Sequence, residues 1–562
     1  MPNKLDSARQ LGISGLVSRA VWRLRMLARI LRFEIYYRHC YSQASTRDWR
    51  LDERVQPSFL CDRDELQSLL AADCIGPVER TRIIRQAQRT LDNRVTVRGH
   101  GEIDLLLTSG NWYDYADCSV MMNRHDYLPP LCQAYQLTRD SRYLTKIDEL
   151  FNYWCDSFSV TNLKQKDTPI DTAIRLLNWL WVIHFQTLTY TEATQKKLKR
   201  IIFIQLEYIR AWSSAGSNHL VLEALAAFVY GVLWKNLKFS RRWQRWASRT
   251  LIDEIQRQVT EDGLHSEQST FYHHIVTTHF LKAYLTGTRN DIEFPEIFVD
   301  RLRKMIRLVH DTTKPDLSYP NLGDGEPLTT DDREHWEAKV LLPAGALLFG
   351  DSVYMDFTRL FNDSCVWFLG AQQSEVETSP TAPTSVVYEK SGLVVLRNED
   401  DYLLFDAAPF SDRHFPHHGH SDALNVELCL AGESLVIDPG SYGYYDDDYR
   451  RYFRSTRSHN TLRLNGRDQS ETFGVFGYGK LAPVQLITAE LHQEPQKIAG
   501  LHNGYDPVTH RREIYYRREQ SSFYLILDWI TGPGEHSFEY FLHLPPGSDV
   551  NLSKQTISTA SG

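Results

Sequence analysis

The spacing of apolar residues changes once along this 562-residue chain, near residue 375, and this change limits the folds open to it. Before that point, apolar side chains recur at helical spacing, as in Leu198, Ile202, Leu206 and Ile209. After it they alternate with polar side chains, as expected for a half-buried strand, as in Leu424, Val426, Leu428 and Leu430. Because the chain is too long for one compact core, we expect a helical domain followed by a β domain.

The helical part divides into many stretches separated by short polar connections such as 138–141. We predict helices at 79–91, 124–137, 141–157, 170–187, 218–235, 240–258, 272–286, 296–311 and 334–348. Short connections favour antiparallel helical hairpins, stacked in a ring or an open arc. No repeat of fixed period is present, so a named solenoid family is not indicated.

The β part begins after residues 374–385, which are rich in Ser, Thr and Pro and are typical of a linker. Turn signals at Gly432 and at Asn465-Gly466 separate candidate strands, and further strands are expected at 522–529 and 537–544. An antiparallel β-sandwich is the natural way to bury their apolar faces. We therefore divide the chain into three parts: a basic helical segment 1–60, a helical domain 61–375 and a β domain 376–562.

The formal net charge of −8 disfavours nucleic acid as a partner. An anionic polysaccharide would instead need local basic clusters within an acidic protein. Aromatic residues make up 12% of the chain, a surplus found in sugar-binding clefts and in ordinary cores alike. The eight cysteines are scattered without C-x-x-C spacing, which disfavours a zinc–thiolate site and a disulfide framework.

No apolar run is long enough for a transmembrane helix, and arginines interrupt each candidate apolar stretch near the N-terminus. These are Arg19, Arg23, Arg25, Arg29 and Arg32. The segment is typical of a basic amphipathic helix that either packs on the main domain or contacts a membrane surface. With no cleavable signal, the cytoplasm is the formal expectation, and a periplasmic or membrane-associated location stays open. The oligomeric state is not indicated.

Two polar segments introduce apolar helices in the first domain. Asn218 and His219 open a very apolar stretch, where they either present donors to an anion at a helix N-terminus or simply cap the helix. The dense polar run 262–274 contains Tyr272, a residue able to transfer protons, but it fits a hydrogen-bonded covering loop equally well.

The β part holds an unusual cluster of four histidines: His414, His417, His418 and His420. A solvated loop would more often carry Lys, Glu or Ser, so a metal or acid–base role is favoured. His420, Asp438 and His459 are plausible ligands of a divalent metal, with zinc favoured by ligand type. A hairpin around Gly432 would pair Asp438 near Val426, so the segment carrying His420 has to bend back to complete the site.

Five motifs follow one another along the chain: SNHLVLEA at 217–224, DGLHSEQS at 262–269, HHGHSDAL at 417–424, DPGSY at 438–442 and SHNTL at 458–462. Together they resemble the characteristic segments of the heparinase II/III family, and 123–131 and 173–177 resemble its N-terminal helical domain. The resemblance covers roughly residues 85 to 545. It implies an (α/α) toroid followed by an antiparallel β-sandwich, with the active cleft between them. It also implies lyase action on heparin, heparan sulfate, alginate or a bacterial exopolysaccharide.

The resemblance also assigns roles to residues. Asn218 and His219 would neutralise the substrate carboxylate, Tyr272 would act as general acid and often as base, and His418 would be the catalytic histidine of the sandwich. The metal site, which the resemblance implies to be structural, would consist of His420, Asp438 and His459.

Substrate contacts are less well defined. Arg124, Arg175 and Glu267 are candidates. A second family tyrosine falls in the segment after Asp438, where four residues compete for the role, with Tyr445 taken as the candidate: Tyr442, Tyr444, Tyr445 and Tyr449.

The expected chemistry is consistent with these residue types. β-Elimination removes the weakly acidic C5 proton of a uronate and expels the C4 oxygen, so donors must neutralise the adjacent carboxylate. Tyrosine, with a reference pKa of about 10, suits donation to the leaving oxygen, whereas histidine, near 6.5, is better placed as a base. Tyr272 is therefore the expected acid, and both His418 and Tyr272 are candidates for the base.

Two other functions fit parts of the sequence. A glycoside hydrolase on a helical toroid needs two carboxylates, and Glu267, Asp324 and Glu326 are available, but this leaves the histidine cluster and Asn218-His219 unexplained. A non-catalytic polysaccharide-binding accessory protein would need none of Asn218, Tyr272 and His418.

Overall fold

The computed structural model of the chain describes most of both predicted domains. The described residues are 59–97, 101–105, 119–158, 167–185, 192–234, 239–325, 339–350, 363–370, 383–411, 416–444, 447–517, 523–551, 553 and 556–558. The basic N-terminal segment, with its predicted membrane contact, lies outside these residues.

The first domain is helical, as predicted. Its helices are α3 (Arg63–Ala71), α4 (Pro77–Leu91), α5 (Ser119–Met122), α6 (Leu128–Thr138), α7 (Ser141–Ser157), α9 (Pro169–His184), α10 (Glu192–Trp212), α11 (Ser217–Leu233), α12 (Ser240–Gln258), α13 (Thr270–Thr288), α14 (Glu296–Thr312), α16 (Leu341–Phe349) and α17 (Asp363–Phe368). The ends of the helices predicted between residues 79 and 311 are correct to within about four residues, or roughly one helical turn. A short hairpin of β1 (Arg94–Val97) and β2 (Gly101–Asp104) was not expected.

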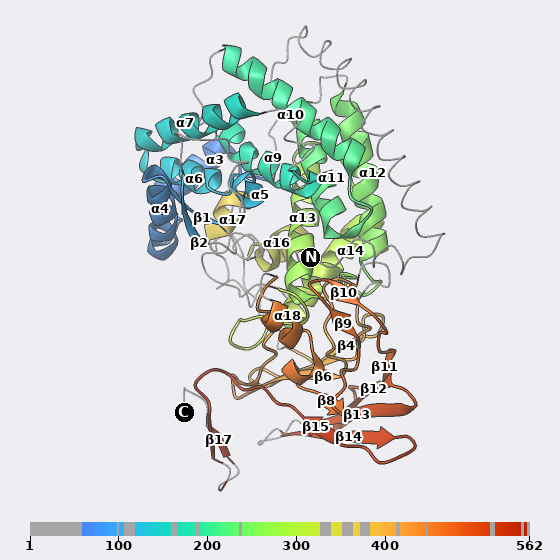
Figure 1. Ribbon diagram of the computed structural model, residues 1–562. Coiled ribbons are helices and arrows are strands. Elements are labelled where there is room, and N and C mark those ends of the chain that lie inside the picture. The colour runs from blue at the N-terminus through green and yellow to red at the C-terminus, as the bar shows by residue number, and fades with distance from the viewer. Residues whose placement is uncertain are drawn as a thin grey trace, which may run out of the picture.

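The helices form two curved layers (Figure 1). Helices α6, α9, α11, α13 and α16 pack one against the next, and α4, α7, α10, α12 and α14 pack against them. In α11 nearly every residue from Val221 to Leu233 is buried, as expected for an inner helix that is apolar on all sides. None of the described helices has the length and hydropathy needed to cross a membrane.

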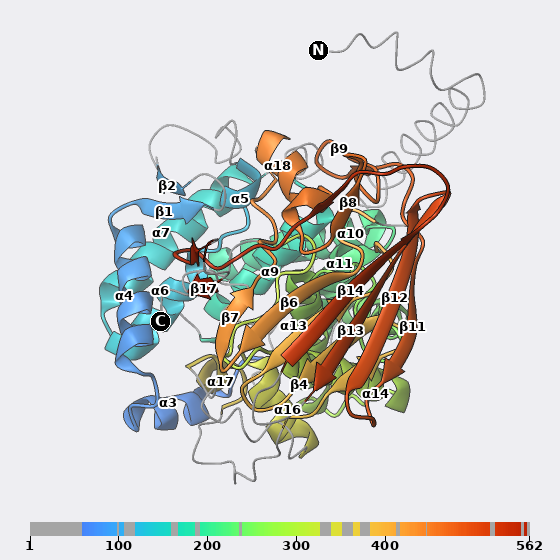
Figure 2. The ribbon, with the colours of Figure 1, turned by 90° about the horizontal axis from the view of Figure 1, so that it is seen from below.

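The second domain contains two stacked antiparallel sheets (Figure 2). The first sheet has the order β3 (Val386–Tyr388), β4 (Leu393–Arg397), β5 (Tyr402–Asp406), β6 (Asn425–Leu430) and β7 (Glu433–Val436). The second has the order β11 (Val484–Glu490), β12 (Gln496–Tyr505), β13 (Val508–Arg517) and β14 (Phe523–Thr531). The fold is thus a helical toroid followed by an antiparallel β-sandwich, as the sequence indicated.

The first sheet is the middle layer of the molecule. Every residue of β4 and β5 is buried, so these strands lack the alternating burial of a sheet with one solvent face. One face, with Val395 and Leu404, packs on Leu264 and Leu308 of the helical domain. The opposite face packs on the second sheet. The sandwich is therefore docked on the helices through a continuous apolar contact.

Polar contacts between the domains surround this apolar interface. The Asp262 carboxylate accepts hydrogen bonds from the backbone N–H groups of Lys390 and Ser391 at 2.8 and 3.0 Å. The Lys314 ammonium forms a buried ion pair with Glu427, at 2.5 Å. Because these partners belong to the other domain, the contacts help to fix how the domains are docked.

A buried polar chain supports the second sheet from within. The Arg512 guanidinium donates to the Asp528 carboxylate, with Nε at 2.8 Å, and to the backbone carbonyls of Leu424 and Asn460, both at 2.7 Å. His510 Nε2 contacts the same carboxylate at 2.6 Å. Burial alone would raise the pKa of Asp528, but His510 and Arg512 outweigh it and lower that pKa to about 2.

We expect Asp528→Asn to lower the free energy of unfolding by about 2 kcal/mol near neutral pH. The folded pKa lies below the unfolded value of 3.8, so the carboxylate stabilises the fold above about pH 4, and this stabilisation is lost as pH falls toward 2. Urea unfolding at several pH values measures the difference. The exposed Glu535→Gln is the control, and a loss for Asp528→Asn that stays constant down to about pH 2 would contradict the assignment.

Candidate active site

The site is formed where the start of α13 meets the loops of the sandwich. Ser269 caps α13, its Oγ accepting from the backbone N–H of Tyr272 at 3.1 Å, which places Tyr272 in the first helical turn. The Tyr272 ring stacks on the His418 imidazole, with centroids 3.9 Å apart and planes inclined by 24°. The structure therefore brings together two predicted catalytic residues from different domains.

A second tyrosine completes this group. The Tyr444 hydroxyl lies 2.9 Å from the Tyr272 hydroxyl. Burial raises the pKa of Tyr444 well above its usual value, and the charges of Tyr272 and Asp324 raise it further, so Tyr444 stays protonated and can donate to the Tyr272 oxygen. Of the four tyrosines that competed for this role, Tyr444 is in contact with the site, whereas Tyr445 lies outside the described residues.

Asp324 is the buried centre of the site, a role that the sequence analysis did not assign to it. Its carboxylate contacts His418 Nδ1 at 3.0 Å and His420 Nε2 at 2.8 Å, and it pairs with both terminal nitrogens of the buried Arg450. Burial alone would raise the pKa of Asp324, but hydrogen bonds from His418, His420 and Arg450 hold it far below its usual range. The carboxylate is therefore charged and fully engaged.

The contact with Asp324 also orients His418. When Nδ1–H donates to the carboxylate, the Nε2 atom is left as the basic nitrogen of the ring. Glu267 Oε2 lies 3.9 Å from this Nε2. The backbone at position 323 passes so close to His418 that a glycine is required there. A Cβ atom at this position would lie 2.8 Å from the His418 carbonyl oxygen, and φ is +66°.

Glu267 does not fit the predicted role of a substrate contact, because it is buried and already bonded to Asn218. Its carboxylate accepts from the Asn218 backbone N–H at 3.0 Å and from Asn218 Nδ2 at 3.0 and 2.8 Å. Burial alone would raise the pKa of Glu267, but His265, His418 and Asn218 lower it. Glu267 therefore holds Asn218 at the start of α11, where the neighbouring His219 is exposed.

The two predicted substrate-contacting arginines lie in different surroundings. Arg175 is fully buried and donates to Gln205, Asn123 and Asp167 at 2.7 to 2.8 Å, so the prediction that it contacts substrate is wrong. Sequence spacing could not separate this core arginine from one in a cleft. Arg124 pairs with Asp171 at 2.7 Å and keeps 16% of its side chain exposed.

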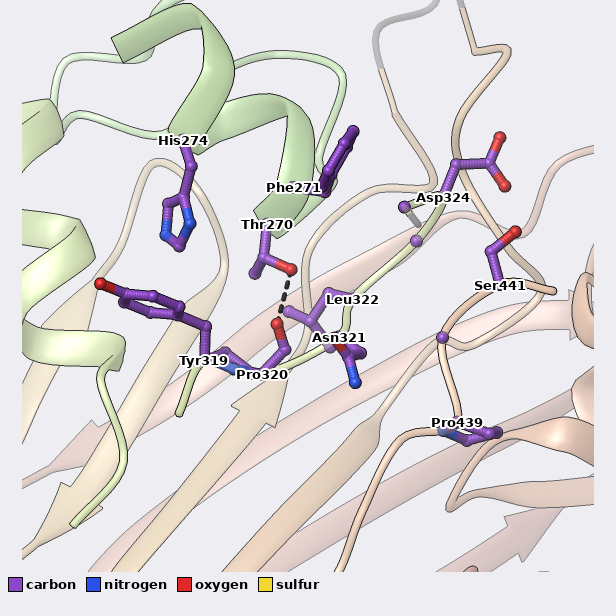
Figure 3. Close-up of a pocket in the computed structure, with 13 residues that line it drawn as sticks. Thr270, Phe271, His274, Tyr319, Pro320, Asn321, Leu322, Asp324, Pro439 and Ser441 are labelled. Atoms are coloured by element: carbon purple, nitrogen blue, oxygen red, sulfur yellow. Dashed lines mark hydrogen bonds between the residues drawn. The ribbon is translucent and has the colours of Figure 1, made fainter. Parts of the chain in front are cut away.

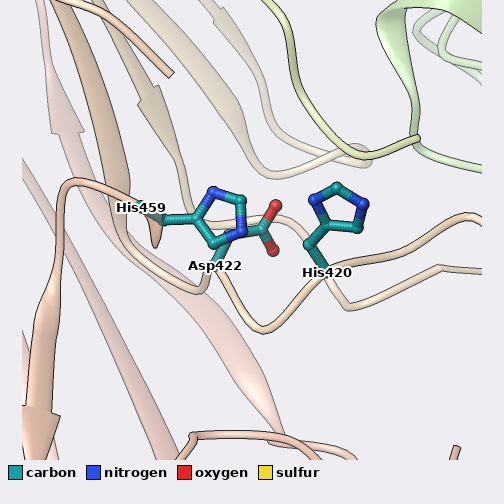
Figure 4. Close-up of side chains that lie close together, drawn as sticks. All are labelled: His420, Asp422 and His459. Atoms are coloured by element: carbon teal, nitrogen blue, oxygen red, sulfur yellow. The ribbon is translucent and has the colours of Figure 1, made fainter. Parts of the chain in front are cut away.

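A candidate metal site lies close to His418, since its member His420 is two residues further along the chain. Ligand atoms of His420, Asp422 and His459 lie within 4.8 Å of one another (Figure 4). Among the described residues, the buried atoms His420 Nδ1 and His459 Nε2 have no hydrogen-bond partner, which is expected of imidazoles that bind a metal through those atoms. These residues could therefore hold a metal ion.

The acidic member of this group differs from the one predicted. Asp438 contacts His459 Nδ1 at 2.8 Å, and its oxygens also accept from Asn425 Nδ2 and the Gly440 N–H, at 2.7 and 2.8 Å. It thus orients His459, while Asp422 faces the two imidazoles. The sequence spacing identified the two histidines correctly, but not the carboxylate. The structure places Asp422, and not Asp438, with the imidazoles of His420 and His459.

A cavity of about 110 Å³ adjoins the site, and Asp324 is one of the residues that line it (Figure 3). It lies between the start of α13, the segment 319–325 and the turn at Pro439–Ser441. The His274 ring meets the Tyr319 ring edge-on, at 4.3 Å between centroids, and Thr270 Oγ1 donates to the Pro320 carbonyl at 2.6 Å. Tyr272 and His418 do not line this cavity, so it is distinct from the place where they meet.

Known structures share this architecture. Heparinase III superposes with a TM-score of 0.66 at 17% identity, covering 93% of this chain and 80% of that one. The heparan sulfate lyase HepC from Pedobacter heparinus gives a TM-score of 0.59 at 18% identity, covering 93% of this chain and 78% of that one. At these identities the likeness establishes the fold.

Curated relatives are similar over much of the chain. A heparin-sulfate lyase of Bacteroides thetaiotaomicron is 22% identical over 487 residues, which are 79% of this chain and 64% of that protein. One of Bacteroides stercoris is 23% identical over 471 residues, 76% of this chain and 64% of that protein. The chain thus spans slightly less than two thirds of the length of these relatives.

Two family models account for most of the sequence. The model of the heparinase II/III N-terminus matches residues 109–342, and the model of the heparinase II/III-like C-terminal domain matches residues 380–562. The first matched range lies within the helical toroid and the second covers the sandwich, and the site described above combines residues of both. On these grounds the chain belongs to the heparinase II/III family.

Proposed function

We propose that this protein is a polysaccharide lyase that cleaves a uronate-containing glycosaminoglycan by β-elimination. The observation that carries the proposal is the contact of Tyr272 with both His418 and Tyr444, which places two hydroxyls and an imidazole together at the domain boundary. Membership of the heparinase II/III family and the curated heparin-sulfate lyases support it. Heparan sulfate is accordingly the first substrate to test, ahead of alginate and bacterial exopolysaccharides.

The site residues suit the steps of β-elimination. Tyr272 is the proposed general acid, giving its proton to the C4 oxygen as the bond to C4 breaks. Tyr272 is left as a tyrosinate, and Tyr444, which stays protonated, stabilises it by donating a hydrogen bond to its oxygen. The base that removes the C5 proton is His418 through Nε2 or Tyr272 itself, according to which face of the uronate carries that proton.

Neutralisation of the substrate carboxylate is assigned to Asn218 and His219. The exposed His219 imidazole is the accessible donor, and the Asn218 amide is held beside it by Glu267. Donors at this place stabilise the charge that develops on the carboxylate as C5 loses its proton. Because both donors lie at the N-terminus of α11, the helix dipole adds to this stabilisation.

The hydrolase alternative is not favoured by the carboxylates of the site. A glycoside hydrolase needs one protonated and one ionised carboxyl group. Asp324 and Glu267 both have lowered pKa values and are both engaged by buried partners, so neither is a suitable proton donor. Glu326 lies outside the described residues. A non-catalytic accessory role would not explain why Tyr272, His418 and Tyr444 are brought into contact.

We further propose that the metal is Zn²⁺ and that its role is structural. Two imidazoles and a carboxylate are typical zinc ligands. His420 lies in the same loop as His418, whereas His459 lies in a segment further along the chain. A metal ion bound by both would fix these two segments relative to each other.

Tyr272→Phe should reduce the rate of unsaturated product formation from heparan sulfate by roughly 10²- to 10⁴-fold, because the general acid is lost while the ring stack is kept. The C4–C5 double bond conjugated to the carboxylate absorbs in the ultraviolet, which gives a continuous assay. Tyr284→Phe, on the same helix α13, is the matched control. New reducing ends without this absorbance would support hydrolysis and contradict the proposal.

Asp324→Asn should lower kcat and destabilise the fold by about 3 kcal/mol, because Arg450 and His418 lose a buried anionic partner. KM should change much less than kcat, since Asp324 orients the base and does not touch the substrate. Asp253→Asn, at an exposed position of α12, is the control for stability. A variant with wild-type kcat would show that His418 does not depend on this contact.

The purified protein should contain about one equivalent of zinc, measured by mass spectrometry, and His420→Ala or His459→Ala should release it. A chelator should lower the unfolding temperature of the wild type and leave these variants unchanged. Comparison of Asp422→Asn with Asp438→Asn identifies the ligating carboxylate, and we expect the larger loss of zinc for Asp422. Full zinc content in both histidine variants would contradict the site.

A further inference from the structure

An exposed aromatic platform lies beside the catalytic residues. The Tyr442 ring stacks on Tyr449, with centroids 4.5 Å apart and planes at 28°, and runs nearly parallel to Phe453 at 6.2 Å. Tyr449 and Phe453 are four residues apart in helix α18 (Asp447–Phe453), so they share one face of it. Tyr442 is nevertheless 57% exposed and Tyr449 52% exposed. The rings thus fix one another while presenting a wide surface to solvent.

The platform residues are close in sequence to residues of the proposed catalytic group. Arg450, which follows Tyr449 in α18, is buried against Asp324, and its guanidinium lies 5.0 Å from the centroid of the Tyr444 ring. Tyr442 is two residues from Tyr444, which contacts Tyr272. Figures 1 and 2 place α18 on the edge of the sandwich that faces the helices. Helix α18 therefore contributes both Arg450, which pairs with Asp324, and Tyr449 of the platform.

An arginine near the platform suits a sugar that bears an anionic group. The Tyr452 ring meets the platform residue Phe453 edge-on, with ring centroids 5.3 Å apart. The Arg457 guanidinium lies 5.3 Å from the centroid of the Tyr452 ring, which is itself 37% exposed. Aromatic rings accept the C–H face of a pyranose, and arginine binds carboxylate or sulfate through paired N–H donors.

We infer that Tyr442 and Tyr449 form a further binding subsite for the polysaccharide, which holds a sugar residue of the same chain that is cleaved at Tyr272. The inference rests on the proposed function, because it takes the occupant to be the continuing substrate. A subsite outside the catalytic group contributes to binding only when the chain is long enough to reach it. Affinity should therefore depend on the platform for long oligosaccharides and not for short ones.

The test measures binding in the full-length Tyr272→Phe protein, in which turnover is suppressed. Calorimetric titration with a heparan sulfate octasaccharide and a tetrasaccharide compares Tyr442→Ala/Tyr449→Ala with Trp529→Ala, which removes an equally exposed ring (54%) from β14. The platform variant should raise the octasaccharide Kd about tenfold and the tetrasaccharide Kd less than about twofold. Tyr442→Phe/Tyr449→Phe keeps both rings and should retain wild-type affinity.

Equal octasaccharide affinity in the platform and Trp529→Ala variants, or no octasaccharide binding at all, would overturn the inference. An equal loss for both oligosaccharides would also overturn it, because the rings would then act within the catalytic group. The proposed function is judged separately by the absorbance assay on the wild type. The two failures can therefore be told apart. In one, the wild type is a lyase but the platform substitutions leave affinity unchanged; in the other, the platform binds the oligosaccharide but the protein has no lyase activity.

Discussion

One buried carboxylate, that of Asp324, holds together three segments that are far apart in the sequence. It pairs with Arg450 of α18 and contacts His418 and His420 of the histidine loop, while its own backbone N–H donates to the His418 carbonyl at 2.9 Å. A buried charge without partners is costly, so this arrangement is stable only when all of them are in place. The orientation of the His418 imidazole and the position of α18 both depend on the Asp324 carboxylate.

The proposed catalytic group forms only when the two domains are docked. Tyr272 belongs to the helical domain, whereas His418 and Tyr444 belong to the sandwich, and the stack between the first two has centroids only 3.9 Å apart. Contacts such as Lys314–Glu427 and the apolar packing of the first sheet on the helices set that separation. Catalytic geometry is thus a property of the domain interface as much as of the loops that carry the residues.

The sequence predicted the helical domain, the sandwich and most of the chemistry-bearing segments, because periodicity and motif order are local properties. It could not identify contacts that only the docked domains create. Asp324 was considered only as a carboxylate of the hydrolase alternative, Arg175 was mistaken for a substrate contact although it is a core residue, and Tyr444 could not be separated from three neighbouring tyrosines. The exchange of Asp438 for Asp422 has the same origin, since spacing does not reveal which way a side chain points.

The first sheet, buried on both faces, has a consequence for how this protein can be divided. A sandwich usually has two outer surfaces that meet water, and such a domain can be moved between proteins as an independent module. Here β4 and β5 present apolar side chains such as Val395 and Leu404 to the helices, so a sandwich made alone would expose a contiguous apolar face. The two domains are therefore expected to be inherited, expressed and engineered as one unit.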